Sequence, residues 1–343
     1  MSVTYKAIGW NRQKKIYDWL IFGLVILYIG AYVGLSVVFT PEVTPETLII
    51  RAFGSLSILM LHVVLAIGPL ARLDQRFLPL LYNRRHLGVS MFLIAAVHGI
   101  FSIIQFHALG SLHPLVSLFV SNSDYGSLSG FPFEVLGFFP LVILFLMAAT
   151  SHDFWLNTLS PRVWKALHMM VYLAWGMLIM HVMLGVVQYN TSLVSVSLVG
   201  SSMTFLIVIH LMAGLKQHRE NNQQNLVEDG FVRVCDLAEI PDKRAKMILA
   251  GGENIAIFRY GNHLSAISNI CKHQNGPLGE GKIVNGCIVC PWHGYEYKPE
   301  DGTSPPPFKE KVATYDLLMR GTVVYVNPSP HPEGTRVEPV KIS

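Results

Sequence analysis

Two cysteines and two histidines in the C-terminal third of the chain have the spacing of an iron–sulfur ligand set. Cys271 and His273 form a C-x-H pair, and after sixteen intervening residues Cys290 and His293 form a C-x-x-H pair. Two thiolates can hold one iron of a [2Fe–2S] cluster while two imidazoles hold the other, which raises the reduction potential above that of all-cysteine clusters. The spacing therefore predicts a one-electron redox centre at these four residues.

The same segment allows a zinc site as an alternative. Cys287 and Cys290 form a C-x-x-C pair, and together with Cys271 and His273 they would complete a tetrahedral ligand set. This alternative leaves His293 and the Pro-Trp-His-Gly run after Cys290 without a role. The spacing therefore favours the iron–sulfur interpretation.

A second set of candidate ligands lies in the N-terminal two thirds of the chain. Five histidines fall inside long apolar stretches: His62, His98, His168, His181 and His210. One such histidine is by default a hydrogen bond between helices, but polar groups inside a membrane are costly, and several in one small bundle indicate function. Imidazoles that face each other across a bundle are what a b-type haem needs for its two axial ligands.

Composition places these histidines in a membrane. The 343 residues are 51% hydrophobic and only 14% charged, where about 25% charged is usual in soluble domains. This excludes a disordered chain and a single water-soluble domain. Six apolar stretches are each about as long as the roughly 20 residues that cross a bilayer core. They cover 18–40, 47–70, 88–108, 131–150, 163–187 and 193–215. We predict an all-α bundle of six helices surrounded by membrane lipid.

Basic residues in the connecting segments give the bundle an orientation. They precede the first stretch, lie between the second and third and between the fourth and fifth, and follow the sixth, whereas 40–46, 107–130 and 188–192 contain no Lys or Arg. Basic residues favour the cytoplasmic side of a membrane. We therefore expect a multi-pass protein of the cell (inner) membrane with both termini in the cytoplasm.

A few polar residues on the outer side of this topology need their own interpretation. Arg51, one turn inside the second stretch, is either a cation that snorkels to the interface or a partner for a buried anion such as a haem propionate. His107, His113 and Asp124 in the long outer segment could bind a metal, but solvated loop residues are the expectation.

Beyond residue 215 the pattern changes from long apolar stretches to short strand-like runs. A polar linker covers 216–225, and clusters of Gly and Pro then separate the runs, which predicts a small all-β domain. The runs are Ile255–Tyr260, Leu264–Ile267, Ile283–Val289, Tyr295–Lys298, Tyr315–Met319 and Val323–Asn327. We expect a membrane domain over 1–218 and a cytoplasmic β domain over 219–343.

The helical part resembles the ferric reductase-like transmembrane family over about 50–190. The resemblance rests on the run Arg84–Gly88 with His98 ten residues later, and on Trp164–His168 followed by Tyr172 and His181. It implies that His98 and His181 ligate a b-type haem nearer the outer face. It also implies that His168 serves a second haem nearer the cytoplasm.

The second ligand of that inner haem is open. The family's usual position, fourteen residues before the outer ligand, is Arg84 here. His62, His86 or His210 could substitute, and His62 has the most suitable depth because the second stretch runs inward.

Helix geometry gives this arrangement partial support. His168 and His181 are 13 residues apart, which is about 20 Å along a helix and suits two haems near opposite leaflets. On an ideal straight helix, however, the two side chains would differ by roughly 140° around the axis.

The C-terminal part resembles the Rieske family from about 227 to 328. Gly276, Gly279 and Gly294 follow the ligand pairs, and the proline-rich run 302–307 matches the loop that shields the cluster in this family. Respiratory Rieske proteins carry a hydroxyl donor directly after the His-Gly pair, where this chain has Tyr295. Fewer hydrogen bonds to the sulfurs imply a lower potential, as in the ferredoxins of ring-hydroxylating dioxygenases.

Together the two resemblances imply a membrane electron-transfer protein. Electrons would pass from a cytoplasmic donor to the [2Fe–2S] cluster, to haem, and toward an unidentified acceptor outside. No G-x-G-x-x-G follows a strand, so we expect a separate NAD(P)H-dependent reductase or ferredoxin as donor. We expect no catalytic residue and no nucleic acid partner.

Two alternatives remain at this point. A membrane quinone, in its reduced form, could reduce the haem while the Rieske domain feeds a cytoplasmic oxygenase or reductase. The helices could instead only tether a ferredoxin and hold no haem.

Overall fold

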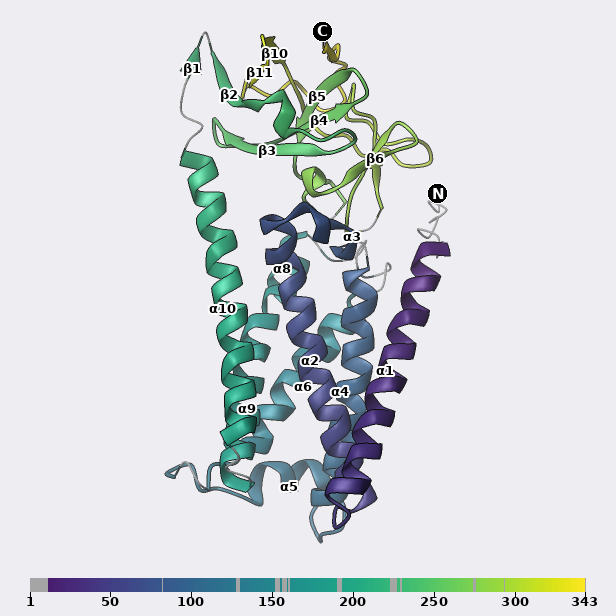
Figure 1. Ribbon diagram of the computed structural model, residues 1–343, viewed down its shortest axis with the longest axis vertical. Helices are drawn as coiled ribbons and strands as arrows, with labels where there is room; N and C mark the ends of the chain where they lie inside the picture. The colour runs from purple at the N-terminus through teal and green to yellow at the C-terminus, as the bar shows by residue number, and fades with distance from the viewer. Residues whose placement is uncertain are drawn as a thin grey trace. The chain divides into compact units, whose positions relative to one another are not determined.

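The computed structural model describes residues 12–81, 83–127, 130–151, 155, 159, 161–189, 193–222, 227–228, 230–273, 276–292 and 294–342. The chain forms two compact units. Helices, purple through teal in Figure 1, make up the N-terminal part, and strands, green to yellow, make up the C-terminal part. The predicted ligand His293 lies outside the described residues.

All six predicted apolar stretches coincide with helices. The helices are α1 (Arg12–Phe39), α2 (Pro45–Leu73), α4 (Arg84–His107), α6 (Phe133–Ala149), α8 (Pro161–Met169) with α9 (Val171–Tyr189), and α10 (Leu193–Asn222). Five of these stretches are long and apolar enough to cross a membrane, and α6 is a shorter apolar helix. The prediction of a multi-helix membrane bundle is confirmed, while α10 continues past the predicted domain boundary at 218.

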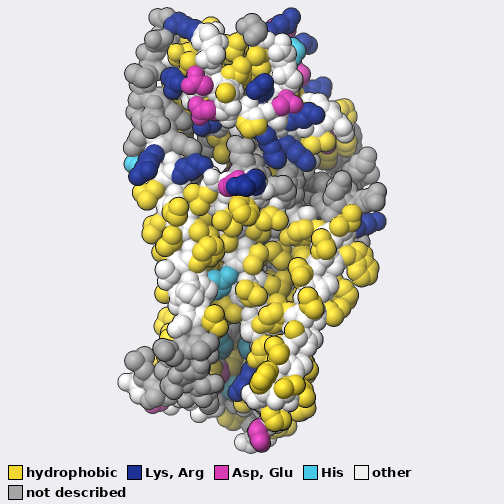
Figure 2. Space-filling model, in the orientation of Figure 1, with side chains coloured by type: hydrophobic (Ala, Val, Ile, Leu, Met, Phe, Trp, Pro, Cys, Tyr) yellow, Lys and Arg dark blue, Asp and Glu magenta, His cyan; other side chains and the backbone are white. Residues whose placement is uncertain are grey.

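The outer surface of the helices is apolar. Trp19, Leu27 and Phe39 of α1 expose 72%, 67% and 76% of their surface, and Figure 2 shows hydrophobic side chains over most of the helical face that it draws. A soluble monomer rarely exposes so large a contiguous apolar patch. Lipid is therefore the solvent of this unit, and the chain is a multi-pass membrane protein.

The fifth predicted stretch is broken rather than continuous. The α-helix α8 ends at Met169, Met170 forms a turn, and α9 begins at Val171. His168 and His181 therefore belong to different helices, so the angle computed for one ideal helix does not apply to them. Three described short helices lie between the long ones: η1 (Gln75–Phe77), α3 (Leu78–Leu81) and α5 (Pro114–Val120).

The C-terminal part is a small all-β domain, as predicted. Its described strands form three antiparallel sheets, ordered β1-β2-β11-β10, β12-β5-β4-β3 with β9 on β5, and β6-β7-β8. The strands are β1 (Val227–Glu228), β2 (Phe231–Asp236), β3 (Ala245–Ala250), β4 (Glu253–Tyr260), β5 (His263–Ser268), β6 (Lys282–Val284), β7 (Cys287–Val289), β8 (Glu296–Tyr297), β9 (Thr314–Tyr315), β10 (Leu317–Arg320), β11 (Val323–Val326) and β12 (Val340–Lys341). Sequence reasoning missed β1, β2, β3 and β12.

Strand β4 is buried on both faces, and this divides the core in two. Ile255 and Ile257 join one cluster, while Ala256 and Phe258 join the other, because successive side chains of a strand point to opposite faces. All four are 0% exposed, and burying a large apolar side chain contributes about 1.5–3 kcal/mol. The second cluster also contains the predicted ligands Cys271 and Cys290, so a packed core supports the candidate site.

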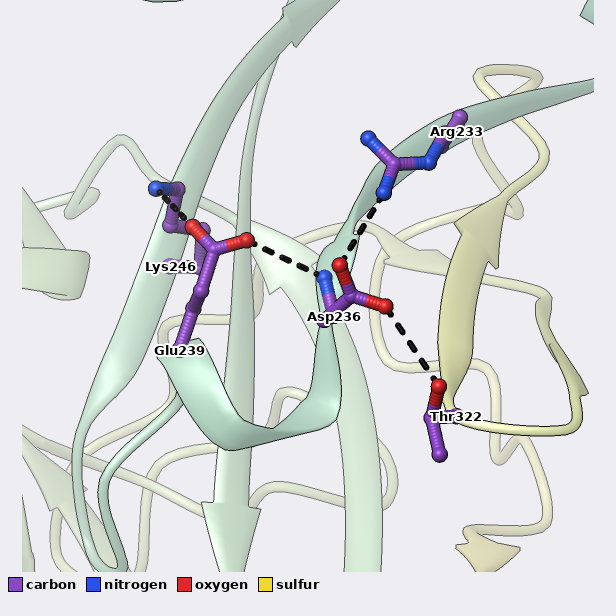
Figure 3. A network of polar contacts seen from close by, with 5 residues as sticks. All are labelled: Arg233, Asp236, Glu239, Lys246 and Thr322. Atoms are coloured by element: carbon purple, nitrogen blue, oxygen red, sulfur yellow. Dashed lines mark hydrogen bonds and ion pairs between the residues drawn. The ribbon is translucent and has the colours of Figure 1, made fainter.

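A polar network joins strands β2 and β3 to the short 3₁₀ helix η2 (Leu237–Glu239). Asp236 accepts from Arg233 at 3.2 Å and from the Thr322 hydroxyl at 3.4 Å, while Glu239 accepts from Lys246 at 3.2 Å and from the Asp236 N–H at 3.2 Å (Figure 3). Burial raises the pKa of Glu239, but the hydrogen bonds from Lys246 and Asp236 outweigh it, and its pKa lies below the usual value.

Cys235, next to this network, is a buried thiol. It is 2% exposed, and burial, with the nearby charge of Glu239 adding to it, raises its pKa to about 12. A thiol with so high a pKa carries almost no thiolate at neutral pH and is unreactive.

Candidate redox centres

Two tight loops hold the cysteines of the predicted cluster. Cys271 follows β5 and Cys290 directly follows β7, and they are 1% and 0% exposed. The Cys271 N–H donates to the Gly276 carbonyl at 2.9 Å, and the Cys290 N–H donates to the Tyr295 carbonyl at 2.7 Å. Each loop therefore closes on itself just after its cysteine, which fixes both sulfurs in the core.

Gly276 brings the two loops together. A Cβ atom at this position would lie 2.9 Å from the Cys290 Sγ and 3.2 Å from atoms of the Trp292 ring. Such close approach requires glycine. The first ligand loop thus packs directly on a ligand of the second, which is the juxtaposition that a cluster bound by both loops needs.

An aromatic ring stacks on the histidine of the first pair, and a second ring contacts the first. His273 stacks on Tyr295 with ring centroids 4.7 Å apart and planes 12° apart, and Tyr295 contacts Phe308 at 4.5 Å. Phe308 directly follows the proline-rich run 302–307. These contacts place the shielding loop beside the ligand loop. Of the four predicted ligands, the structure describes three.

Tyr297 contacts a predicted cluster ligand, and sequence reasoning missed it. Its hydroxyl lies 3.4 Å from the Cys271 Sγ and accepts the Lys272 N–H at 3.1 Å. A cysteine that holds iron is a thiolate and can only accept, so with a cluster bound the Tyr297 hydroxyl would be the donor of this contact. Burial raises the pKa of Tyr297 well above its usual value, so the hydroxyl keeps its proton.

The expectation of fewer hydrogen bonds to the sulfurs concerned a hydroxyl donor directly after the His-Gly pair, where this chain has Tyr295, and it stays a prediction. Tyr297 supplies a hydroxyl two residues later, beside a cysteine sulfur. A signal for it was present, because residues i and i+2 of a strand lie on the same face. Hydrogen bonds to the sulfurs are among the features that set the potential of an iron–sulfur cluster.

The structure gives the zinc alternative no support. Cys271, His273, Cys287 and Cys290 all lie in the described part of the chain, and no three or more His, Cys, Asp or Glu side chains gather around one point there. Cys287 lies in β7, on the strand that leads into Cys290. The [2Fe–2S] interpretation rests on the spacing of the two ligand pairs.

In the helical unit, His98 of α4 and His181 of α9 face each other. The His98 Nδ1 donates to the Ile50 carbonyl and the His181 Nδ1 to the Phe133 carbonyl, both at 2.8 Å. A carbonyl can only accept, so Nδ1 carries the proton and Nε2 is the nitrogen with a lone pair for a metal. The two ring centroids are 6.3 Å apart, with planes 79° apart.

That separation fits one iron held between two imidazoles. Two metal–nitrogen bonds of about 2 Å, plus about 1 Å from each nitrogen to its ring centre, add to nearly the observed distance. The protonation pattern and the spacing of His98 and His181 therefore suit the axial ligation of a haem. Their role as ligands stays a prediction.

The other histidines of the bundle have different partners. His62 donates from Nδ1 to the Ile58 carbonyl at 2.8 Å, and its Nε2 lies 3.5 Å from the Trp175 Nε1. His168 bonds the Trp164 carbonyl at 3.0 Å and stacks on that indole at 3.8 Å. Among the described ring contacts, His62 and His168 thus meet tryptophans rather than each other.

His86 and His210, the other proposed substitutes, are also engaged. His86 bonds the Asp18 carboxylate at 2.9 Å, which joins α4 to α1. His210 bonds the Leu206 carbonyl at 2.8 Å and the Tyr172 hydroxyl at 3.3 Å. These contacts are what the default interpretation of an intramembrane histidine predicts, and the second ligand of an inner haem stays open.

The polar residues near the α4–α6 connection show one wrong expectation. His107 is only 7% exposed and bonds the Ser117 hydroxyl at 3.1 Å, so it is not a solvated loop residue. His113 caps α5 and Asp124 accepts from Ser127 within its own loop. Arg51 is exposed and directly follows Ile50, which leaves both of its interpretations open.

Comparison with known proteins identifies both parts of the chain. Residues 52–180 match the family model of the ferric reductase like transmembrane component, and residues 230–316 match that of the Rieske [2Fe-2S] domain. The predicted fusion of these two domains is confirmed.

Curated relatives resemble limited stretches of the chain. Cholesterol 7-desaturase nvd 1 of Ciona intestinalis is 32% identical over 89 residues, which are 25% of this chain and 19% of that protein. The anthranilate 1,2-dioxygenase ferredoxin subunit of Burkholderia cepacia is 42% identical over 45 residues, 13% of this chain and 42% of that protein. The chain thus spans about a fifth of the first relative and less than half of the second.

Among solved structures, the ferredoxin of carbazole 1,9a-dioxygenase from Nocardioides aromaticivorans IC177 is similar. It is 27% identical, covers 29% of this chain and 98% of its own, and has a TM-score of 0.28.

Proposed function

We propose that this chain, a ferric reductase like transmembrane component followed by a Rieske [2Fe-2S] domain, transfers electrons between a cytoplasmic donor, its cluster and a b-type haem in the membrane. The observation that carries the haem assignment is the facing pair of His98 and His181, each with the same 2.8 Å bond from Nδ1 to a backbone carbonyl. The ligands assigned to the cluster are Cys271, His273, Cys290 and His293.

The chain's own residues would ligate, insulate and tune these groups. Haem and cluster each supply one-electron redox chemistry when bound. His98 and His181 present neutral imidazoles, which add no buried charge to the bundle. Tyr297 would donate a hydrogen bond to a cluster ligand, and Tyr295, which contacts Phe308, would cover one face of the His273 ring.

A second haem is a weaker part of the proposal. His168 and His62 are its candidate ligands, and their rings contact Trp164 and Trp175. Arg51 is the candidate partner for a haem propionate, because it directly follows the residue whose carbonyl holds His98.

The donor would be a separate NAD(P)H-dependent reductase or ferredoxin in the cytoplasm, and the acceptor would lie on the other side. Two observations support this direction. The basic residues favour a cytoplasmic location for both ends of the bundle, and the relatives include ferredoxin subunits of oxygenase systems.

Reduction kinetics in membranes test this proposal. A ferredoxin reductase with NAD(P)H should reduce the b-type absorption band in wild-type membranes, and at least about tenfold more slowly in Cys271→Ala, which lacks a cluster ligand. Reduction of that band by a quinol analogue, but not by the reductase, would mean reversed flow. The absence of any b-type band would leave only a tethered ferredoxin.

A further inference from the structure

The two helix pairs that carry the facing histidines repeat one arrangement. His98 of α4 bonds the carbonyl of Ile50 in α2, and His181 of α9 bonds the carbonyl of Phe133 in α6. Each histidine lies 48 residues after the residue that it bonds, and each bond is 2.8 Å long. The segments 50–98 and 133–181 therefore present their imidazoles in the same way.

Each copy also has a glycine one turn after the carbonyl. Gly54 follows Ile50 by four residues and Gly137 follows Phe133 by four, and residues i and i+4 lie on the same face of a helix. The imidazole that bonds the carbonyl therefore lies against the glycine of the same helix face.

The glycines leave no room for a side chain. A Cβ atom on Gly54 would lie 2.7 Å from Nδ1 and 2.9 Å from Cε1 of His98. One on Gly137 would lie 2.8 Å from Cε1 and 2.9 Å from Nδ1 of His181. Carbon atoms at such distances overlap, so any larger residue would displace the imidazole.

We propose that Gly54 and Gly137 are positioning residues for the two axial haem ligands. The missing Cβ lets each ring lie against the neighbouring helix. There the carbonyl accepts a hydrogen bond from the Nδ1–H, and Nε2 faces the opposite imidazole. This inference rests on the proposed function, because it assumes that His98 and His181 hold a haem.

The consequence of displacement follows from the chemistry of the ring. An imidazole pushed away from Gly54 loses its hydrogen bond to the Ile50 carbonyl, which leaves a buried N–H without a partner. It also moves Nε2, so the iron loses one axial ligand while the ligand on the other helix pair remains. A haem with one open position binds carbon monoxide, whereas a haem with two histidine ligands does not.

Alanine substitutions with matched controls test the proposal. Gly54→Ala and Gly137→Ala are compared with Gly30→Ala in α1 and Gly214→Ala in α10, where nothing lies within 4 Å of the new Cβ. Alanine favours a helix over glycine, so the controls should be no less stable than the wild type. Each full-length protein is purified, and haem per Rieske cluster is measured together with the carbon monoxide difference spectrum.

We expect Gly54→Ala and Gly137→Ala to keep the Rieske EPR signal and to show a several-fold rise in haem that binds carbon monoxide. The controls should match the wild type. An unchanged carbon monoxide spectrum in both variants would overturn the inference. So would equal loss of haem and cluster, or failure of both variants to accumulate, because a general packing fault has that result. A wild-type protein without haem would defeat the proposed function instead.

Discussion

The β domain and the helical bundle both present side chains suited to iron, but they position them in different ways. In the β domain, two loops place Cys271 and Cys290 by short hydrogen bonds within each loop. In the bundle, His98 and His181 are placed by carbonyls 48 residues earlier in the chain. In the sequence, ligands that share one loop are therefore recognised by their characteristic spacing. Ligands that lie on separate helices appear in the sequence only as isolated histidines.

Glycine has the same purpose in both regions. Gly276 lets one ligand loop lie against the Cys290 sulfur, and Gly54 and Gly137 let imidazoles lie against helices. In each case the ligand approaches a backbone, and the loss of one Cβ makes that approach sterically allowed. Two unrelated folds thus use the same device at their candidate metal sites.

The largest expected effect tests whether the two centres are independent. His98→Ala should remove most of the haem held by His98 and His181 and leave the Rieske EPR signal, because it deletes an axial imidazole altogether, rather than displacing it, and does not touch the β domain. Cys271→Ala should remove the cluster and leave the haem. Haem is measured by its alkaline pyridine spectrum and the cluster by EPR.

Loss of both centres in either variant would break this comparison, since it would mean that one region cannot fold without the cofactor of the other. Retention of full haem in His98→Ala would instead remove that histidine from the ligand set.

A smaller effect should come from Tyr297 in the β domain. Tyr297→Phe removes the hydroxyl at 3.4 Å from the Cys271 sulfur, and the reduced cluster, which carries more negative charge, loses more from this than the oxidised one. We expect the potential to fall by about 40 mV, the equivalent of about 1 kcal/mol. Redox titration followed by EPR measures it.

Tyr325→Phe is the matched control, because that ring contacts Arg320 in the other part of the domain. An unchanged potential in Tyr297→Phe, or an equal fall in Tyr325→Phe, would mean that the hydroxyl does not act on the cluster.

Sequence reasoning succeeded where the relevant interactions are local. The alternation and the glycine-rich loops identified the β domain and its ligand pairs, and long apolar runs identified the helices. It missed Tyr297, whose contact depends on the strand after the second ligand loop, and it missed the strands β2 and β12, whose pairing partners lie far away in the chain.

In the helical unit, too, local features were predicted and features that depend on long-range packing were missed. The apolar run 163–187 gave no sign of the turn at Met170, since a break in one helix depends on its packing against others. His107 was expected in solvent because its loop is polar, yet α5 folds over it and Ser117 bonds its ring. We expected His98 and His181 to face each other because of the family resemblance, and not because of their spacing in the sequence.

The smallest expected effect concerns a polar network away from both centres. The lowered pKa of Glu239 means that its carboxylate is favoured in the folded state. Its contribution is therefore present above the unfolded-state pKa, about 4.5, and is lost as the pH falls through the lower folded-state value.

Glu239→Gln should thus lower stability by at most about 0.5 kcal/mol at neutral pH, because the Glu239 side chain in the ion pair with Lys246 is about half exposed to solvent. The difference from the wild type should vanish at acid pH. Thermal loss of the visible Rieske absorption in the full-length protein measures both. A loss that grows as the pH falls would contradict the stated role of the carboxylate.

Combined optical and EPR redox titration of the purified full-length protein tests the central claim most directly. The account predicts a b-type absorption band from a low-spin haem with two histidine ligands, and a Rieske EPR signal from the same polypeptide. Zinc in place of paired iron, or a preparation without a b-type band, would contradict it.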